Sequence, residues 1–264
     1  MHVGMAGFGA LSATAMLALA AAPAAAQARG ERIVAIGAGP QIAPKFIGSD
    51  ELRLFPMPLI DIRREGDPLR LETPDEGIGL GLLGPSSAID FGPSIQIQTK
   101  RKDEDAGVAI GEVDTSVELG GFVQWQGLPW LRVRVEGRKA VSGHDGVNGD
   151  ILVDLVHRSR ATLVSIGPRA RVSNARFQRA YFGVDPAQSA RTGLAVFQPD
   201  GGVHAVGVAS SVQHQFNGRW GLYGYAAYDR LVGDAADSPF IRSFGSRNQF
   251  SAGLGLTYSF RLGL

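Results

Sequence analysis

The last residues of the chain, Phe250–Leu264, alternate strictly between apolar side chains and small or polar ones. The apolar positions are Phe250, Ala252, Leu254, Leu256, Tyr258, Phe260, Leu262 and Leu264. Successive side chains of a β-strand point to opposite faces, so this pattern predicts a strand with one apolar and one polar face. Strands of soluble proteins usually have about 5–6 residues, whereas strands that cross an outer membrane need roughly 9–11 with this alternation. The stretch therefore favours a transmembrane β-barrel.

The composition is compatible with this fold and excludes several classes of function. Of the 264 residues, 36 are glycine, which suits tight turns and strands better than helices. The net charge of +1 gives no basic excess, so nucleic-acid binding is not expected. The chain has no cysteine, which excludes disulfides, thiolate metal sites and a cysteine nucleophile.

The N-terminus has the pattern of a secretory signal peptide. Residues 1–26 contain no Lys, Arg, Asp or Glu, and their apolar run ends in the small residues around Ala24 and Ala26. We expect cleavage after Ala26, with Ala28 as a second possible site; a retained membrane anchor is the alternative interpretation. No later stretch reaches the roughly 18 apolar residues of a membrane helix, so a mature chain inside a membrane must be a barrel.

Residues 27–264 are predicted to form a single domain of short alternating segments. The segments are 33–39, 51–63, 68–73, 76–83, 88–99, 113–125, 130–141, 150–158, 161–172, 203–216, 219–232 and 247–261. Short connections, such as the hairpin signal Asn217-Gly218, mostly alternate with longer ones, such as 173–202, which is long enough to fold over the barrel mouth. We therefore predict a closed antiparallel transmembrane β-barrel of about twelve strands, with short periplasmic turns and longer outer loops.

Four prolines fall inside predicted strands. They are Pro56, Pro58, Pro93 and Pro168. Proline cannot donate a hydrogen bond to a neighbouring strand, so it belongs at sheet edges or bulges, and a closed barrel has no edge. We expect either bulges or different strand boundaries at these four positions.

Aromatic residues gather near the ends of the predicted strands. They are Trp125, Trp130, Trp220, Tyr223, Tyr225, Tyr228, Tyr258 and Phe260. Aromatic side chains are enriched where a membrane meets water, so we interpret this set as girdles at the membrane boundary. The three tryptophans flank short turns and would mark the periplasmic girdle; ordinary core aromatics are the alternative interpretation.

Charged residues alternate on one face of the segment 130–141 and are the candidates for lining the lumen. They are Arg132, Arg134, Glu136 and Arg138, and the neighbouring segment adds Glu118. We expect Glu118 to lie directly opposite Arg138 on the inner face, with their Cβ atoms about 4.5–5.5 Å apart. The same register places Gly120 opposite Glu136 and Gln124 opposite Arg132. The simplest interpretation is a lumen filled with water or with the barrel's own side chains. A lumen lining that selects anions is the functional alternative.

One glycine motif resembles a cofactor fingerprint. Gly79, Gly81 and Gly84 have the spacing of a dinucleotide-binding loop, but Pro85 and another predicted strand follow where a helix is required. We interpret these glycines as barrel-strand residues, and we expect no cofactor.

The histidines and the acidic loops suggest weaker hypotheses. An outer-membrane lipase would need a histidine beside a nucleophile, and the scattered candidates are His144, His157, His204 and His214, with Ser210 or Ser211 near His204. Oxygen ligands for a divalent cation could come from Asp145, Asn148 and Asp150, or from Asp234 and Asp237. Neither loop has an EF-hand spacing, so we expect solvated acids and no metal site. We also expect no catalytic residues.

Several motifs point to one protein family. They are Phe46–Asp50, Tyr181–Val184, Tyr228–Pro239, Gly245–Phe250 and Gly253–Phe260. Together they resemble the MipA/OmpV family of Gram-negative outer-membrane proteins over essentially the whole mature chain. One departure is that Arg261–Leu264 follow Phe260, whereas such barrels commonly end at the terminal aromatic residue.

The resemblance implies a β-barrel in the cell outer membrane, in contact with membrane lipid and lipopolysaccharide. For the MipA branch it implies a non-enzymatic scaffold that brings a lytic murein transglycosylase together with a murein synthase. A narrow channel for small solutes is the second hypothesis, and an outer-membrane lipid hydrolase is the third.

Overall fold

The described chain forms one curled antiparallel sheet. The structure is a computed structural model that describes residues 32–84 and 87–262; the predicted signal peptide and its cleavage site at Ala26 lie outside the described residues. The strands are β1 (Arg32–Pro44), β2 (Leu52–Arg64), β3 (Ile78–Gly79), β4 (Ile89–Gln98), β5 (Ser116–Leu128), β6 (Leu131–Ala140), β7 (Val147–Arg158), β8 (Thr162–Ser173), β9 (Gly202–Gln215), β10 (Trp220–Leu231) and β11 (Asn248–Leu262). Their spatial order is β2-β1-β11-β10-β9-β8-β7-β6-β5-β4-β3. The predicted all-β, antiparallel fold is confirmed.

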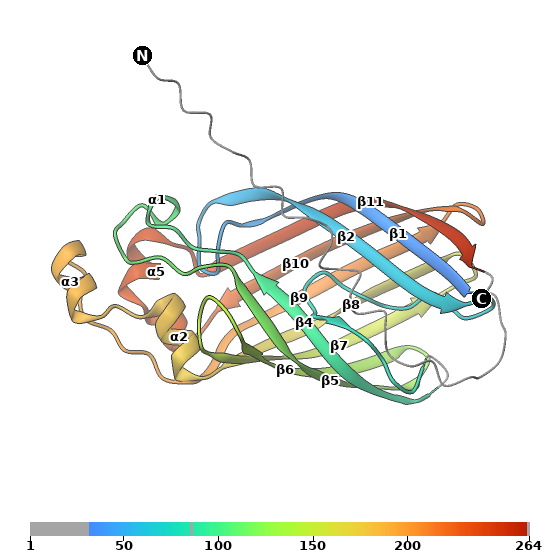
Figure 1. Cartoon of the computed structure of the whole chain (residues 1–264), viewed down its shortest axis with the longest axis horizontal. Helices are drawn as coiled ribbons and strands as arrows, with labels where there is room; N and C mark the ends of the chain where they lie inside the picture. Colours follow the sequence, from blue (N-terminus) through green and yellow to red (C-terminus); the bar gives the residue numbers. More distant parts are fainter. Residues whose placement is uncertain (1–31, 85–86, 263–264) are drawn as a thin grey trace, which may run out of the picture.

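The two ends of the barrel differ, as Figure 1 shows. We call the end that carries the short connections 129–130, 159–161 and 216–219 the turn end, and the opposite end the loop end. Arg32 at the start of β1 pairs with Leu262 near the end of β11, so both strands meet at the turn end. The helices gather at the loop end. None of the helices in the described part of the chain has the length and apolar character that a membrane span requires.

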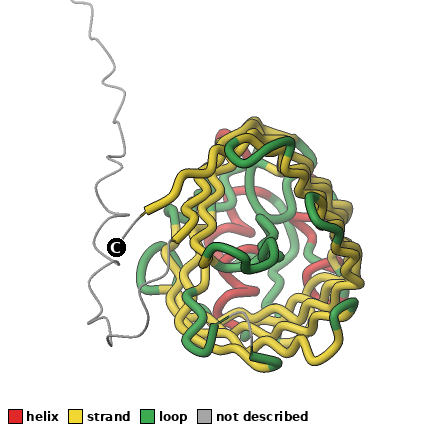
Figure 2. The backbone as a smooth tube through the Cα atoms, turned by 90° about the vertical axis from the view of Figure 1, so that its right-hand side faces the viewer, coloured by secondary structure: helices red, strands yellow, loops and turns green. Residues whose placement is uncertain are grey.

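The outer face of the wall is apolar because the strands keep their period-2 pattern. In β11, the side chains of Leu254 and Leu256 are 55% and 54% exposed, while Ser259 on the other face is 2% exposed. Figure 2 shows the strands surrounding an interior that loop segments occupy. A wall with exposed leucines outside and buried polar groups inside is the arrangement that hydrocarbon requires.

The prediction of twelve strands closed into a ring is not confirmed. The predicted segment 68–73 forms no strand, and residues 65–77 turn into the interior instead. The sheet ends at β2 on one side and at β3 on the other, and no ladder joins these two strands in the part of the chain that the structure describes. The backbone continues β3 as far as Leu82, whose N–H donates to Phe91 O (3.0 Å).

The prolines lie where a missing donor costs little. Pro40 of β1 faces Pro56 of β2, so this pair cannot exchange hydrogen bonds, and the backbone polar groups of Pro56 must point away from β1 toward the free edge of the sheet. Pro58 has the same orientation because it lies two residues further along β2. The β2 strand is therefore an edge of the kind that proline tolerates.

Pro168 lies in an interrupted ladder. The pairing of β7 with β8 stops at Leu152–Arg169 and resumes at Leu155–Ile166. Nη1 of Arg169 donates to the carbonyl of Val153 (3.3 Å), which stands opposite Pro168. An arginine side chain thus takes the place of the N–H that proline lacks.

Most of the predicted girdle lies on the outer face, but two of its members do not. Trp125, Trp130 and Trp220 are 38–52% exposed and lie near the turn end. Tyr223 and Tyr225 are only 2% and 6% exposed, because their positions in β10 point into the barrel. The assignment of these two tyrosines to the girdle was wrong.

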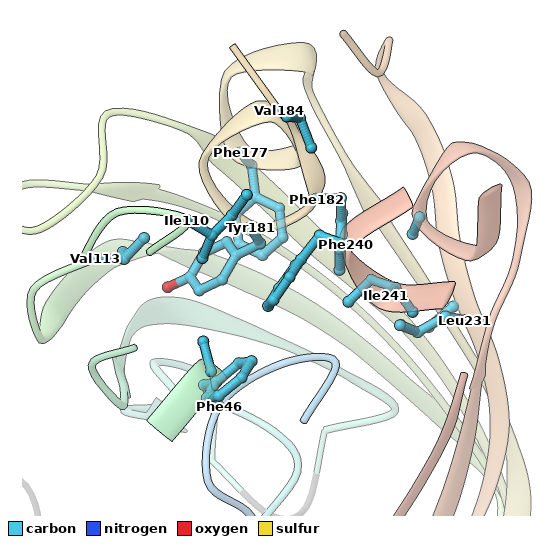
Figure 3. Close-up of a cluster of buried hydrophobic side chains, with 13 residues drawn as sticks. Phe46, Ile110, Val113, Phe177, Tyr181, Phe182, Val184, Leu231, Phe240 and Ile241 are labelled. Carbon is cyan, nitrogen blue, oxygen red and sulfur yellow. The ribbon is translucent and has the colours of Figure 1, made fainter. Parts of the chain in front are cut away.

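Five short helices close over the loop end. They are α1 (Asp103–Ala106), α2 (Ala175–Phe182), α3 (Pro186–Thr192), α4 (Gly233–Asp237) and α5 (Pro239–Phe244). With the neighbouring loops they bury one apolar cluster, which we call the cap core: Phe46, Ala106, Ile110, Val113, Phe177, Tyr181, Phe182, Val184, Ala205, Leu231, Ala235, Phe240 and Ile241. Figure 3 shows these side chains converging from loops on several sides of the barrel. The cap core therefore spans the mouth.

One arginine holds two of the outer loops to the cap core. Arg101 lies before α1, is 2% exposed and stacks on the Phe240 ring at 5.3 Å. Its guanidinium donates to Tyr181 O (2.8 Å) and Gly111 O (3.1 Å). Burial lowers the pKa of Arg101 to about 10, so the side chain remains a cation at neutral pH.

Candidate functional site: the filled lumen

The structure places the five candidate lumen charges in the barrel interior. Arg132, Arg134, Glu136 and Arg138 alternate along β6 and are at most 6% exposed, and Glu118 of β5 is 0% exposed. The intervening side chain of Val135 is 48% exposed on the outer face. Alternation along one strand is sufficient to bring the four β6 charges together.

The predicted register between β5 and β6 was wrong by two residues. Glu118 lies opposite Ala140, Gly120 opposite Arg138, and Gln124 opposite Arg134. Two features differ from the prediction: β5 continues to Leu128 instead of ending at Trp125, and the ladder shifts by one residue between Trp125 and Leu128. Arg138 still reaches Glu118 diagonally, with 3.4 Å between Nε and Oε2.

The interior is filled by residues 65–77, which we call the inner segment. It leaves the wall after β2 and rejoins it at β3. Wall side chains from three strands donate hydrogen bonds to its backbone carbonyls. These bonds join Arg132 Nη1 to Leu71 O (2.9 Å), Gln213 Nε2 to Arg70 O (3.1 Å) and the Tyr223 hydroxyl to Glu72 O (3.3 Å). Because the donors come from β6, β9 and β10, the segment is held from several sides of the barrel.

Arg132 is the central contact between the wall and the inner segment. Its Nη2 lies 2.9 Å from Oε2 of Glu76 in the segment, and its Nε donates to Oδ2 of Asp154 in β7 (2.9 Å). The arginine and Asp154 are both 0% exposed. A guanidinium satisfied in this way offsets the desolvation of all three charges, whereas loss of the cation would leave two buried carboxylates without it.

Asp75 is the second anchor of the inner segment. One of its carboxylate oxygens lies 2.7 Å from Nε of Arg169 and 3.4 Å from Nη2 of Arg171. Arg171 also contacts Asp150 and Asp229 at 2.9 Å each. The segment is thus joined to a network that continues across β7, β8 and β10.

The network continues toward the loop end. Arg138 pairs with both Glu136 and Asp150. Glu118 lies 3.1 Å from Nε2 of His144 and accepts hydrogen bonds from the Asn148 amide (3.0 Å). The ring of His144 packs edge-on against Phe177 of the cap core at 5.1 Å. The charged interior and the apolar cap are therefore in direct contact.

Glycines allow the inner segment to approach the wall. A Cβ atom added at Gly77 would lie 2.9 Å from Glu136 Oε2, and one at Gly79 would lie 2.6 Å from the Phe122 ring. A Cβ atom at Gly81 would lie 1.9 Å from Asp90 Oδ2. Close packing explains Gly79 and Gly81, whereas an added Cβ at Gly84 would meet no atom within 4 Å, and the positive φ of Gly84 (82°) is what favours glycine there.

The lumen charges are paired with charges of the opposite sign. Each interior arginine named above contacts at least one carboxylate, so they do not form the ring of one sign that an anion-selective pore needs. A cavity of about 20 Å³ remains near the turn end, between Leu59, Leu69 and His214. A space of this size holds about one water molecule.

The other candidate residues have structural partners. His204 lies 2.9 Å from Ser173 Oγ, away from Ser210 and Ser211, and no described carboxylate makes a hydrogen bond to it. His214 contacts Thr162 (2.8 Å), and His157 is exposed on the outer face.

The acidic residues of the outer loops are also engaged with the protein. Asp145 pairs with Arg176 (3.3 Å), Asp237 with Arg247 (3.5 Å), and Asp234 accepts from the Asp200 N–H (2.8 Å). Among the described residues, no group of three or more His, Cys, Asp or Glu side chains could hold a metal ion.

Comparison with known proteins decides the family. The model of the family described as MltA-interacting protein MipA matches residues 36–260, which include the wall, the inner segment and the cap. The chain belongs to the MipA family. The resemblance drawn from the sequence motifs is thereby confirmed, and membership of this family agrees with the apolar wall in placing the protein in the outer membrane.

Solved outer-membrane proteins are also similar to this family member. The COG4313 outer membrane channel from Pseudomonas putida F1 has 9% sequence identity and a TM-score of 0.43, with 91% of this chain and 100% of that chain covered. The outer membrane protein OprG from Pseudomonas aeruginosa has 10% identity and a TM-score of 0.28, with 88% and 96% covered. No curated protein sequence matches the chain.

Proposed function

We propose that the protein is a sealed outer-membrane barrel that serves as a docking platform for periplasmic murein-remodelling enzymes. The observation that carries this proposal is the filled lumen, in which the inner segment is bound by Arg132, Arg169 and Arg171. A barrel that has no path for a solute can act only through its exposed surfaces. The family description, which names interaction with MltA, supports a lytic murein transglycosylase as one partner. A murein synthase as a second partner rests on the resemblance alone.

The turn end is the surface that such partners would meet, because short turns of outer-membrane barrels face the periplasm. Its exposed arginines in the described part of the chain are Arg32, Arg64, Arg160, Arg219 and Arg261. The acids beside them are Glu65, which pairs with Arg261 at 2.7 Å, and Asp67. A basic face of this kind favours a partner with a complementary acidic face, since such complementarity raises the association rate.

A retention experiment tests the docking proposal. The full-length barrel is immobilised in detergent, and a purified MltA-type transglycosylase is passed over it at about 150 mM salt, where only specific charge pairs persist. We expect retention by the native chain and a clear loss with Arg160→Glu/Arg219→Glu at the turn end. The matched variant Arg179→Glu/Arg191→Glu carries the same change at the loop end and should retain the enzyme fully. Absence of retention by the native chain, or equal loss in both variants, would contradict the proposal.

We also infer that the wall is closed within the membrane, while the inner segment stays in the lumen and adds no strand to the wall. Hydrocarbon offers no hydrogen bonds to an unpaired strand edge, so an open edge is costly there. Pro56 and Pro58 lower this cost at β2, because they remove two donors from its free edge.

A narrow channel is the second candidate function. The observation that favours it is the chemistry of the inner segment, whose contacts with the wall are largely ion pairs and hydrogen bonds that water can replace. A channel would require this segment and the cap to move together, because each one closes the lumen separately.

A further inference from the structure

Three arginines surround a pocket on the outside of the loop end. Arg230 is the penultimate residue of β10, Arg242 lies on α5, and Arg247 immediately precedes β11. The pocket between them has a volume of about 400 Å³ and is completed by Ile241, Gly245, Ser246 and Asn248. None of these arginines takes part in the lumen network.

The charges of this pocket are largely uncompensated. Nη1 of Arg230 donates to the neutral side chain of Asn248 (2.9 Å). Nε of Arg247 donates to the carbonyl of Ala236 (2.8 Å), and its only acidic contact in residues 32–84 and 87–262 is the exposed Asp237 at 3.5 Å. Within the described residues, the exposed guanidinium of Arg242 has no hydrogen-bond or ion-pair partner. Three cations facing one solvated acid make a site for an anion.

The position of the pocket along the barrel indicates where that anion comes from. On the outer face, Tyr228 pairs with Phe250, and their rings lie 4.8 Å apart. At the other end of the same two strands, Trp220 packs against Tyr258 at 4.9 Å. The two aromatic pairs are eight residues apart, or about 26 Å along the strand, which corresponds to roughly 20 Å across the membrane at the usual tilt of barrel strands, close to the height of an outer-membrane apolar band.

Arg230 and Asn248 are the next outward-facing pair beyond Tyr228 and Phe250. The Tyr228 hydroxyl donates to Oδ1 of Asn248 (2.9 Å), the same atom that accepts from Arg230. The Tyr228–Phe250 pair thus lies at the membrane boundary, where aromatic side chains are enriched. The arginines lie beyond this pair toward the loop end, at the depth of lipid headgroups.

We propose that this pocket binds the phosphate of an outer-leaflet glycolipid of the lipid A type. A phosphate presents several acceptor oxygens, and arginine donates to such a group through two parallel N–H bonds. The loop end faces the cell exterior, where the outer leaflet carries phosphorylated glycolipid. A free phosphate ion would need no aromatic pair beside the site, whereas an acyl chain below the headgroup lies directly on Tyr228 and Phe250.

The test compares two variants that lose the same charge at the same end of the barrel. Arg230→Gln/Arg242→Gln/Arg247→Gln removes the pocket arginines. Arg176→Gln/Arg179→Gln/Arg191→Gln removes three exposed arginines of α2 and α3, away from the pocket. Binding of bisphosphorylated lipid A to each full-length protein in nanodiscs is measured, with heat-modifiable gel migration as the check that each barrel has folded.

We expect the Kd for lipid A to rise at least about tenfold in the pocket variant and to stay unchanged in the control variant. Dephosphorylated lipid A should bind the native protein as weakly as lipid A binds the pocket variant. Equal losses in the two variants, or equal binding of dephosphorylated lipid A, would overturn the proposal. Displacement of lipid A by inorganic phosphate at similar occupancy would show a small-anion site and would also overturn it. If the triple variant does not fold, Arg242→Gln alone removes an exposed, unpartnered side chain and should still raise the Kd severalfold.

Discussion

Replacement of Arg132 by alanine is expected to lower the free energy of unfolding by about 3–5 kcal/mol. The side chain is 0% exposed and lies between the carboxylates of Glu76 and Asp154. Its removal would free the carbonyl of Leu71 and would leave Glu76 with only Arg134 at 3.7 Å, whereas Asp154 keeps its ion pair with Arg169 (2.8 Å). Urea unfolding of the refolded barrel, followed by tryptophan fluorescence, measures the change.

The control for this prediction is Arg219→Ala. Arg219 is exposed in the β9–β10 turn, so its loss should change the free energy of unfolding by less than about 0.5 kcal/mol. A similar small change for Arg132→Ala would mean that water reaches Glu76 and Asp154, and the filled lumen would then be wrong.

Conductance should appear only when both barriers of the lumen are removed. The first barrier is the inner segment, which is removed by replacing residues 68–76 with a Gly-Ser sequence of equal length. The second is the cap core, which is opened by Phe182→Ala/Phe240→Ala, since each deleted phenyl ring is 0% exposed and leaves a cavity that costs about 3–5 kcal/mol. We expect the native chain and each single lesion to be silent in planar bilayers, and the combined variant to conduct.

The matched control for the cap lesion is Phe244→Ala on the same helix. Phe244 is 36% exposed and lies outside the cap core, so its combination with the Gly-Ser replacement should stay silent. Steady conductance by the native chain would contradict the sealed barrel and favour the channel.

The wall was predictable from sequence because its determinants are local. The alternation of Phe250–Leu264 and of the β6 charges fixes which side chains face outward, whatever their partners are. The hairpin at Asn217-Gly218 is equally local, and Asn217 Oδ1 accepts from the Trp220 N–H (2.9 Å). By contrast, the two-residue error in the β5–β6 register arose because β5 continues past Trp125 to Leu128 and its ladder shifts there, which alternation alone does not reveal.

The inner segment was missed because its sequence has the same local pattern as a strand. Leu69, Leu71 and Thr73 alternate with charged or polar residues, as they would in the wall. What draws the segment inside is the pairing of Asp75 and Glu76 with arginines on distant strands. Such pairing follows from the three-dimensional arrangement, and periodicity does not encode it.

The helices of the cap had sequence signals that could have located them. Asn174 accepts from the Phe177 N–H at the start of α2 (3.0 Å), and Asp185 with Gln188 forms a capping box at α3, where Pro186 is the first helical residue. Their shortness hid them, since neither helix reaches the 12 or so residues for which periodicity is a reliable indication.

The most direct test of the sealed lumen asks whether the inner segment lies inside the barrel. Leu71 packs against Val156 of β7 in the interior, whereas the adjacent Leu155 is 54% exposed on the outer face. The chain has no cysteine, so Leu71→Cys can be combined with Val156→Cys or with Leu155→Cys and treated with a short bifunctional thiol reagent. We expect an intramolecular cross-link, seen as a shift in gel migration, for Cys at 71 and 156 only. Equal cross-linking of both pairs, or none with 156, would show that residues 65–77 do not fill the lumen.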